Sequence, residues 1–347
     1  MSEKTTIYSL AKELNMTPSM VSRAFTPSAR IDPEKRRLVL EAAERHGYRP
    51  NRAASRLSGE EIRIAVIISS AAVHVNDLLL RGIREAAAQR ADCKVIPVIR
   101  MIPADTPHAE RIRQCEAAVD ASMDSRGAIL TGFSDDALRP SVRRLRERMP
   151  VVFLQDKLEN EDCLFASCHD ERTAARMACE LLDLSLRCAP PEKRRVLLFT
   201  GDRSIWLHRN ADAAFRAACA EYGLELVDSM EMHDSDDCLR SLLDDAVLQR
   251  ADTLGGIYIT SGNCLELCRF IKAHRLPLSL ITFDVYDRLN AYVRDGTVQV
   301  TMCQNLVKQA KNAYLGLCDY LISGQKPDPV VLSEVLPVMR SNLHLFE

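Results

Sequence analysis

The chain has 347 residues, of which 47% are hydrophobic and 27% are charged, as is typical of a folded globular protein. One ordinary hydrophobic core does not extend over this length, so we expect two or three folding units. No stretch approaches the roughly 18 consecutive apolar residues of a membrane span, and the first residues lack the apolar centre of a secretion signal. We therefore expect a cytoplasmic protein that has no membrane partner.

The net charge of −2 conceals a basic head on an acidic body. Residues 1–59 hold eleven Lys or Arg against six Asp or Glu, which gives +5, and the remaining residues carry −7. A basic end confines affinity for a polyanion to one part of a chain. The charge distribution therefore predicts nucleic-acid binding by the N-terminal segment.

The twelve cysteines include no C-x-x-C pair, and the closest spacing is that of Cys264 with Cys268. This spacing can place two thiols on one helix face, but no second pair or histidine follows at a metal-ligand spacing. We interpret the cysteines as free thiols of a reduced protein, most of them in its core, and we expect neither a metal nor a cofactor.

Capping signals and apolar spacings in the first fifty residues predict three short helices, over residues 6–14, 18–25 and 33–46. Thr17 with Pro18, and Asp32 with Pro33, each supply a capping side chain followed by proline at the first helical position. Asn15 tolerates the left-handed backbone that a sharp turn between the first two helices requires. Two short helices joined by a tight turn and braced by a third are typical of a helix-turn-helix, with a small three-helix bundle as the alternative.

The segment from residue 6 to 59 closely resembles the DNA-binding head of the lactose/galactose repressor (LacI/GalR) family of transcriptional regulators. The resemblance rests on MVSRAF (residues 20–25), on RHGYRPNRAASRL (residues 45–57) and on the spacing between them. It implies an all-α helix-turn-helix domain, a hinge, and a core that binds an effector and dimerises, over residues 1–49, 50–60 and 61–347.

The same resemblance implies which side chains contact operator DNA. Pro18, Ser19 and Arg23 occupy the face of the second helix that enters the major groove and reads bases. Arg23 is the strongest reader, because a guanidinium can donate two hydrogen bonds to guanine O6 and N7, whereas Pro18 offers only apolar contact. The side chains expected to contact phosphates and set the register are Tyr8, Ser22, Arg30 and Asn51.

The basic hinge over residues 51–58 is too short to be stable as an isolated helix in water. The resemblance implies that it becomes helical on operator DNA, where Leu57 inserts between base pairs in the minor groove with Ala54 and Arg56 beside it. The alternative is that Leu57 packs within the hinge and that the flanking arginines are solvated linker charges.

From residue 62, apolar strand-like runs alternate with amphipathic helices in two series. This alternation predicts two doubly wound α/β lobes, each with a parallel sheet covered by helices on both faces. The body resembles the periplasmic-binding-protein-like core of the same family, through HRNADAAF, ITSGN, ITFDVYD and TMCQN. The resemblance implies that the chain crosses between lobes near residues 155–162, 295–300 and 322. Lobe 1 then comprises residues 61–157 and 299–322, and lobe 2 comprises residues 158–298 and 323–347.

Ligands of such folds bind outside the carboxyl ends of the strands, in a cleft between the lobes. The resemblance implies that Arg209 clamps a hydroxyl or carboxylate of the effector, that Asp284 accepts hydrogen bonds from sugar hydroxyls, and that Gln304 is a third polar contact. Trp206, beside Arg209, suits the apolar face of a sugar ring, although it could equally be a structural tryptophan. Further candidate cleft residues are Asn263, Ser261, Ser69, Ser70, Asp135 and Asp136.

The motifs of common enzyme classes are missing from the sequence. It contains no G-x-S-x-G elbow, no phosphate-binding loop, no H-E-x-x-H and no dinucleotide fingerprint, so we expect no enzyme. The predicted function is a repressor that binds a pseudo-palindromic, double-stranded operator as a homodimer and responds to a carbohydrate-like small molecule. A regulator that responds to a protein partner or to no ligand is the alternative, and the basic head disfavours an exported solute-binding protein.

Overall fold

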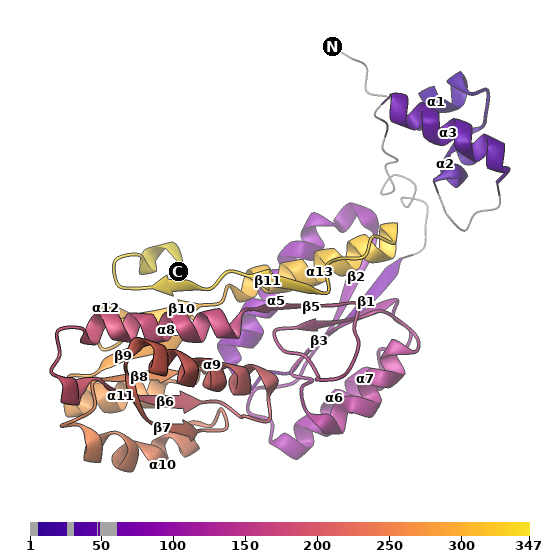
Figure 1. The fold of residues 1–347 in the computed structure, drawn as a ribbon. Coiled ribbons are helices and arrows are strands. Elements are labelled where there is room, and N and C mark those ends of the chain that lie inside the picture. The colour runs from indigo at the N-terminus through magenta and orange to yellow at the C-terminus, as the bar shows by residue number, and fades with distance from the viewer. Residues whose placement is uncertain (1–5, 26–30, 47, 49–60) are drawn as a thin grey trace. The chain divides into compact units, whose positions relative to one another are not determined.

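The computed structural model describes residues 6–25, 31–46, 48 and 61–347 (Figure 1). These residues form two compact units, which divide between residues 60 and 61. The first unit is all-α and the second is α/β, as the sequence predicts.

The first unit consists of three helices, α1 (Ile7–Glu13), α2 (Pro18–Ala24) and α3 (Pro33–Arg45). Each predicted cap forms: Thr17 Oγ1 accepts a hydrogen bond from Met20 N at 3.2 Å, and Asp32 Oδ1 accepts one from Glu34 N at 3.0 Å. Asn15, between α1 and α2, has a φ of 49°, in the left-handed region. The predicted helix-turn-helix is confirmed.

A small apolar core holds the three helices together. Its fully or nearly buried members are Leu10, Ala11, Val21, Ala24, Val39, Ala42 and Ala43. The apolar spacing predicts that Leu38 lies on the inner stripe of α3, but this residue is 38% exposed and Val39 is fully buried instead. The reason is helical phase, because Val39, Ala42 and Ala43 follow the i, i+3, i+4 spacing of one face.

The second unit contains two six-stranded sheets, and we call the part around each sheet a lobe. Lobe 1 has the strand order β11-β5-β4-β3-β1-β2, with all pairs parallel. Its strands are β1 (Ile62–Ile68), β2 (Val95–Met101), β3 (Gly127–Thr131), β4 (Val151–Leu154), β5 (Phe165–His169) and β11 (Val330–Ser333).

Lobe 2 has the order β12-β10-β9-β8-β6-β7, in which only β12 is antiparallel to its neighbour. Its strands are β6 (Arg195–Thr200), β7 (Glu225–Glu231), β8 (Gly256–Ile259), β9 (Ser279–Phe283), β10 (Val300–Cys303) and β12 (Leu336–Val338).

Helices cover both faces of each sheet, which confirms the predicted doubly wound architecture. In lobe 1, the helices are α5 (Val73–Gln89), α6 (His108–Asp120), α7 (Arg139–Arg146) and α13 (Leu306–Ser323). In lobe 2, they are α8 (Glu171–Leu186), α9 (Trp206–Tyr222), α10 (Asp236–Ala246), α11 (Leu265–His274) and α12 (Asp287–Arg294). Gly82 allows α5 and α13 to approach closely, because a Cβ there would lie 2.5 Å from Val307 O.

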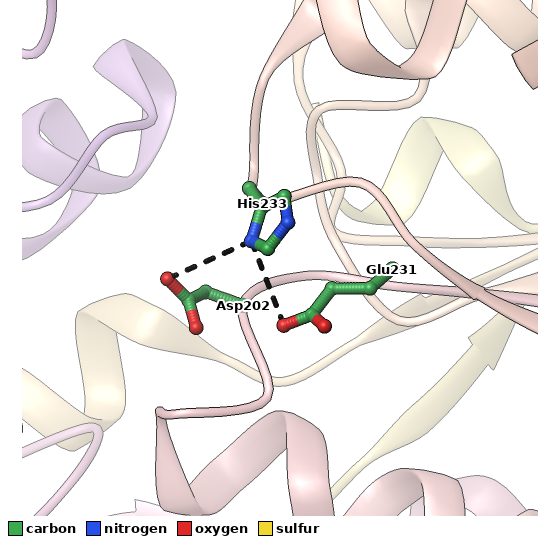
Figure 2. Close-up of side chains that lie close together, drawn as sticks. All are labelled: Asp202, Glu231 and His233. Atoms are coloured by element: carbon green, nitrogen blue, oxygen red, sulfur yellow. Dashed lines mark ion pairs between the residues drawn. The ribbon is translucent and has the colours of Figure 1, made fainter.

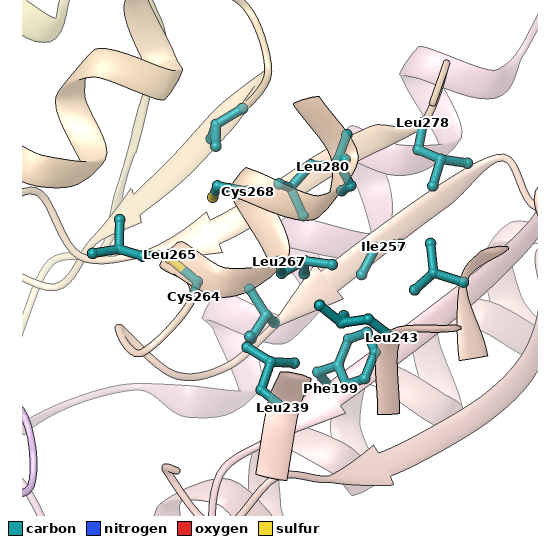
Figure 3. Close-up of a cluster of buried hydrophobic side chains, with 14 of the residues drawn as sticks. Phe199, Leu239, Leu243, Ile257, Cys264, Leu265, Leu267, Cys268, Leu278 and Leu280 are labelled. Carbon is teal, nitrogen blue, oxygen red and sulfur yellow. The ribbon is translucent and has the colours of Figure 1, made fainter. Parts of the chain in front are cut away.

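A large cluster of buried apolar side chains lies between the sheet of lobe 2 and α10 to α12 (Figure 3). Phe199 of β6 and Leu243 of α10 meet there, and complete burial of one such side chain contributes about 1.5–3 kcal/mol. Cys264 and Cys268 belong to the same cluster, as free and buried thiols. This placement agrees with the interpretation of these cysteines as core residues.

The chain crosses between the lobes three times, each time later than the sequence predicts. The crossings run from β5 to α8, from β10 to α13 and from β11 to β12. The first discrepancy arises because β5 and α8 are not among the predicted elements. Strand β5 reads FASCH, and its buried Ser167, Cys168 and His169 hide the strand from an apolar pattern.

Candidate functional site

One face of α2 is exposed and carries the predicted base-reading residues. Pro18, Ser19 and Arg23 are exposed, whereas Val21 and Ala24 of the same helix are buried. The apolar spacing therefore directs the three predicted reading side chains away from the core.

The remaining predicted DNA contacts are placed only in part. Tyr8 is 73% exposed and Ser22 is half-buried, so both have surface available for a phosphate. The predicted contacts that lie outside the described residues are Arg30, Asn51, Ala54, Arg56 and Leu57.

The arginines of the head differ in what they bind within the chain. Arg37 of α3 forms ion pairs with Glu34 at 2.6 Å and with Glu41 at 2.8 Å, and these hydrogen bonds raise the pKa of its guanidinium. Arg23 has no ion-pair partner among the described residues. Its guanidinium is therefore free to bind an external acceptor.

The centre of the predicted cleft is closed by direct contact between the lobes. Asp284 follows β9 and is buried, with Oδ1 accepting a hydrogen bond from Gln304 Nε2 at 2.8 Å. Its Oδ2 lies 3.2 Å from Nε2 of His74, a residue of α5 in lobe 1. The His74 ring stacks on Tyr286 with 3.9 Å between centroids and 16° between planes. We call His74, Asp284 and Tyr286 the interlobe junction.

Gly262 makes the interlobe junction possible. A Cβ at this position would lie 2.5 Å from His74 Nε2, and its carbonyl oxygen accepts a hydrogen bond from the Tyr286 hydroxyl at 2.6 Å. Both oxygens of Asp284 therefore have partners within the chain, one of them from the opposite lobe. A ligand that binds Asp284 has to displace His74 or share the carboxylate with it.

A second polar cluster in lobe 2 organises the predicted residues Ser261 and Asn263. Ser261 Oγ donates to Asp234 Oδ1 at 2.6 Å, and Asn263 Nδ2 donates to Asp234 O at 2.7 Å. Burial alone would raise the pKa of Asp234, but His208, the Ser261 hydroxyl and a backbone N–H lower it well below its usual range. Burial likewise opposes the charge of His208, and the Asp234 carboxylate more than compensates, so the pKa of this imidazole is raised. The cluster is thus an ion pair satisfied within the lobe.

Arg209 and Trp206 lie at the start of α9 and contact segments of lobe 1. Arg209 Nη2 pairs with Glu159 Oε2 at 2.6 Å, and its Nη1 donates to Arg203 O at 2.9 Å. The ammonium of Lys157 lies 4.8 Å from the centroid of the Trp206 ring. Arg209, predicted to bind the effector, therefore forms an ion pair between the lobes. The Trp206 ring, predicted to stack on a sugar, instead contacts the Lys157 ammonium.

The candidates from lobe 1 have local structural roles. Ser69 is buried directly after β1 and its N–H donates to Thr131 O at 3.2 Å. The Ser70 N–H donates a hydrogen bond to Asn76 Oδ1 at the start of α5, and Asn76 Nδ2 donates one to Ser70 O. Asp135 accepts from Ala137 N, and Asp136 pairs with Arg139 at the surface.

Sequence reasoning missed His74, Tyr286, His208 and Asp234, which complete these networks. His208 and Tyr286 lie within HRNADAAF and ITFDVYD, but nothing in these markers singles them out, and His74 is 210 residues away from Asp284 along the chain. Asp234 and Asp284 also have left-handed φ values of 52° and 68°, which aspartate tolerates better than most non-glycine residues but does not by itself predict.

One group on the lobe 2 surface has the composition of a metal site (Figure 2). His233 Nδ1 lies 3.6 Å from Glu231 Oε1 and 4.0 Å from Asp202 Oδ2. Glu231 Oε1 already accepts a hydrogen bond from Arg203 N at 2.6 Å, and the histidine is exposed. We interpret the group as a surface ion-pair cluster, since the histidine is exposed and the Glu231 oxygen that faces it is already hydrogen-bonded to a backbone N–H.

The comparison with family profiles assigns the second unit. Residues 64–326 match the family described as periplasmic binding protein domain. The chain belongs to this family. None of the described helices is long and apolar enough to cross a membrane.

Two curated relatives carry the names of regulators. Catabolite control protein A of Priestia megaterium is 36% identical over 83 residues, which are 24% of this chain and 25% of the relative. The lactose operon repressor of Escherichia coli (strain K12) is 26% identical over 152 residues, which are 43% of this chain and 40% of the relative. The matches thus span less than half the length of these relatives. They confirm the resemblance to the LacI/GalR family.

A solved structure shares the two-lobed fold. The periplasmic ribose ABC transporter protein from Conexibacter woesei DSM 14684 has a TM-score of 0.69 and 22% identity, over 83% of this chain and 94% of that chain. At this identity the likeness is one of fold, and it confirms the predicted periplasmic-binding-protein-like core.

Proposed function

We propose that this protein is a sequence-specific, DNA-binding transcription regulator, a repressor of the LacI type, that binds a pseudo-palindromic operator as a homodimer. The observation that carries the proposal is the outward face of α2. Pro18, Ser19 and Arg23 are exposed on a helix whose start is fixed by the Thr17 cap. An exposed helix that presents an arginine without an internal partner suits the major groove, where arginine reads guanine.

The α/β unit is proposed to regulate this binding through a small-molecule effector, carbohydrate-like, between the lobes. The relatives named as regulators and the ribose protein of the same fold support this assignment. In this proposal Asp284, Gln304 and Arg209 contact the effector once the lobes separate far enough to admit it. The coupling to DNA then equals the difference in effector affinity between the free and the DNA-bound protein.

The DNA part of the proposal is tested by selecting binding sequences from a random pool with the full chain. We expect a two-fold related site and an affinity that falls steeply with salt concentration, as phosphate contacts require. Enrichment of no common sequence would contradict sequence-specific binding.

The effector part is tested by a thermal-shift screen of sugars, polyols and sugar acids on the full chain and on Asp284→Asn. A ligand that stabilises the parent and not the variant supports the proposed effector site. A ligand that stabilises both equally binds elsewhere and contradicts it.

A regulator that closes without any ligand is the second candidate, and the interlobe junction favours it. His74 already supplies both a polar partner for Asp284 and a flat ring on Tyr286. A histidine that fills the effector's place would keep the core in one conformation, so that control would come from a protein partner or from the amount of the regulator. Failure of every compound in the screen to stabilise His74→Ala, as well as the parent, would select this candidate.

A further inference from the structure

A cavity of about 280 Å³ lies beside the first crossing and is lined from both lobes. Since a water molecule takes about 30 Å³ in the liquid, the cavity can hold a ligand of several non-hydrogen atoms. Of the predicted effector residues, only Trp206 lines it, and His74, Asp284 and Tyr286 do not. The cavity is therefore distinct from the interlobe junction.

Three buried side chains of this cavity carry polar atoms without a hydrogen-bond partner. They are Asp156 Oδ1, His169 Nδ1 and Glu171 Oε1. The residues are 9%, 2% and 4% exposed, so water does not easily satisfy them. A buried carboxylate oxygen without a donor is costly, and three orphaned atoms around one cavity indicate a missing partner rather than a packing defect.

The chemistry of these atoms defines the partner. Burial raises the pKa of Glu171 to about 7 and also raises that of Asp156, so the cavity alone favours their protonated forms and a bound cation would favour the ionised forms. Ionised carboxylates only accept hydrogen bonds, and a neutral imidazole offers an acceptor nitrogen. Burial lowers the pKa of His169 to about 4, so its ring is neutral at physiological pH and repels no cation. A hydroxyl would need donors as well as acceptors around it, whereas an ammonium group only donates and also neutralises a buried acid.

The other walls suit the body of an organic cation. Val330 and Leu332 of β11 form an apolar side, and the Trp206 ring already holds the Lys157 ammonium at 4.8 Å. The ring face thus accepts a cation in this environment. The lining acids Asp156, Asp170 and Glu171 outnumber the lining cations Lys157 and Arg172 by one.

We infer that this cavity binds a small organic cation, a primary ammonium on a short apolar body, with Asp156 and Glu171 as its acceptors. The inference does not depend on the proposed DNA binding or on the proposed sugar effector. Because Asp156 follows β4 of lobe 1 and Glu171 begins α8 of lobe 2, an occupant would link the two lobes at their hinge.

The test uses n-butylamine, which is protonated at neutral pH, and its neutral analogue 1-butanol, titrated by calorimetry into the full chain. We expect n-butylamine to bind at least tenfold more tightly than 1-butanol, and Glu171→Gln to weaken it at least tenfold. Glu180→Gln, an exposed residue of the same helix, is the matched control and should bind as the parent does. D-Ribose should bind no more weakly to Glu171→Gln than to the parent.

Equal affinity for n-butylamine and 1-butanol, or equal effects of the two glutamine variants, would overturn the inference. D-Ribose binding that is lost in Glu171→Gln would also overturn it, since the cavity would then be a polyol site. If Glu171→Gln does not fold, Asp156→Asn replaces it with the same expectation. Asp284→Asn should retain n-butylamine binding, which separates this site from the proposed effector site.

Discussion

The head and the core of this protein treat charged side chains in opposite ways. Arg23 in the head is exposed and has no ion-pair partner among the described residues, whereas Asp284 in the core is buried with both oxygens engaged. The exposed arginine can exchange its water for an external acceptor such as a guanine edge. The interlobe junction is complete without a ligand, so an effector has to compete with His74 there. The predictions below test this contrast.

The largest expected effect concerns Glu171, a buried acid at the hinge. Unlike Asp284, it has a carboxyl oxygen without a hydrogen-bond partner in the described part of the chain. Burial raises the pKa of the Glu171 carboxyl from 4.5 to about 7. Between these pH values the folded protein keeps a proton that the unfolded chain has lost, so raising the pH removes stability. Glu171→Gln abolishes this loss, and its stability relative to the parent should increase by about 3 kcal/mol between pH 4.5 and 7.

His169 produces the opposite slope, because its pKa falls from 6.5 to about 4 on folding. The free energy of unfolding therefore falls as the pH falls through this range, because only the unfolded chain takes up this proton. In the parent, this pH slope partly cancels the opposite slope of Glu171, whereas in Glu171→Gln it does not. Denaturant unfolding at several pH values between 4.5 and 7.5 measures the difference. Parallel curves for the parent and Glu171→Gln, like those expected for Glu180→Gln, would contradict the prediction.

Next in size is the loss of base reading. Arg23→Ala should weaken binding to the selected operator by about 10- to 100-fold, because one bidentate arginine–guanine contact contributes about 1–3 kcal/mol. Arg37→Ala is the matched control, since Arg37 is paired within α3, and should change the affinity less than threefold. Fluorescence anisotropy at fixed salt measures both. Equal losses for the two variants would mean that charge, and not the outward face of α2, determines binding.

An effect of comparable size, on stability rather than on DNA affinity, is expected at the interlobe junction. His74→Ala removes the ring that joins the lobes, at a cost of about 1.5–3 kcal/mol for a hydrogen bond to a charged group. Trp206, the single tryptophan, contacts Lys157 of the opposite side and reports on lobe separation. We expect its emission to shift to longer wavelength in His74→Ala and to stay unchanged in His344→Ala. An unchanged spectrum in both would show that the lobes stay closed without this contact.

The smallest effect is that of a single hydroxyl. Tyr286→Phe loses the hydrogen bond to Gly262 O but keeps the ring that stacks on His74. The free energy of unfolding should fall by about 1 kcal/mol, with Trp206 emission unchanged. Tyr292→Phe is the control. A red shift in Tyr286→Phe would mean that the hydroxyl, and not the stacked ring, holds the junction.

Much of the fold could be predicted because local signals agree with it. Proline after a capping residue marks the starts of α2 and α3, and continuous apolar runs mark strands such as β1. The prediction failed where the chain changes lobe. At the first crossing, the short strand β5 contains three polar or thiol residues and gives no clear period, and the helix α8 that follows it was also missed.

The candidate site could be predicted only where a family motif reaches it. Asp284 and Gln304 follow recognisable strand ends, and they are hydrogen-bonded to each other. Their partner His74 comes from the other lobe, and no periodicity links residues that far apart. The orphaned atoms of Asp156 and Glu171 are a property of packing, which a sequence pattern does not contain.

The three crossings also constrain how the chain acquires its structure during synthesis. Helix α13 covers lobe 1, and the edge strands of both sheets, β11 and β12, come from residues 330–338. Neither lobe can therefore finish folding on the ribosome before nearly the whole body has been made. At about 5–20 residues per second, the open sheet of lobe 1 waits several seconds for α13, a delay in which chaperones have access to its uncovered face.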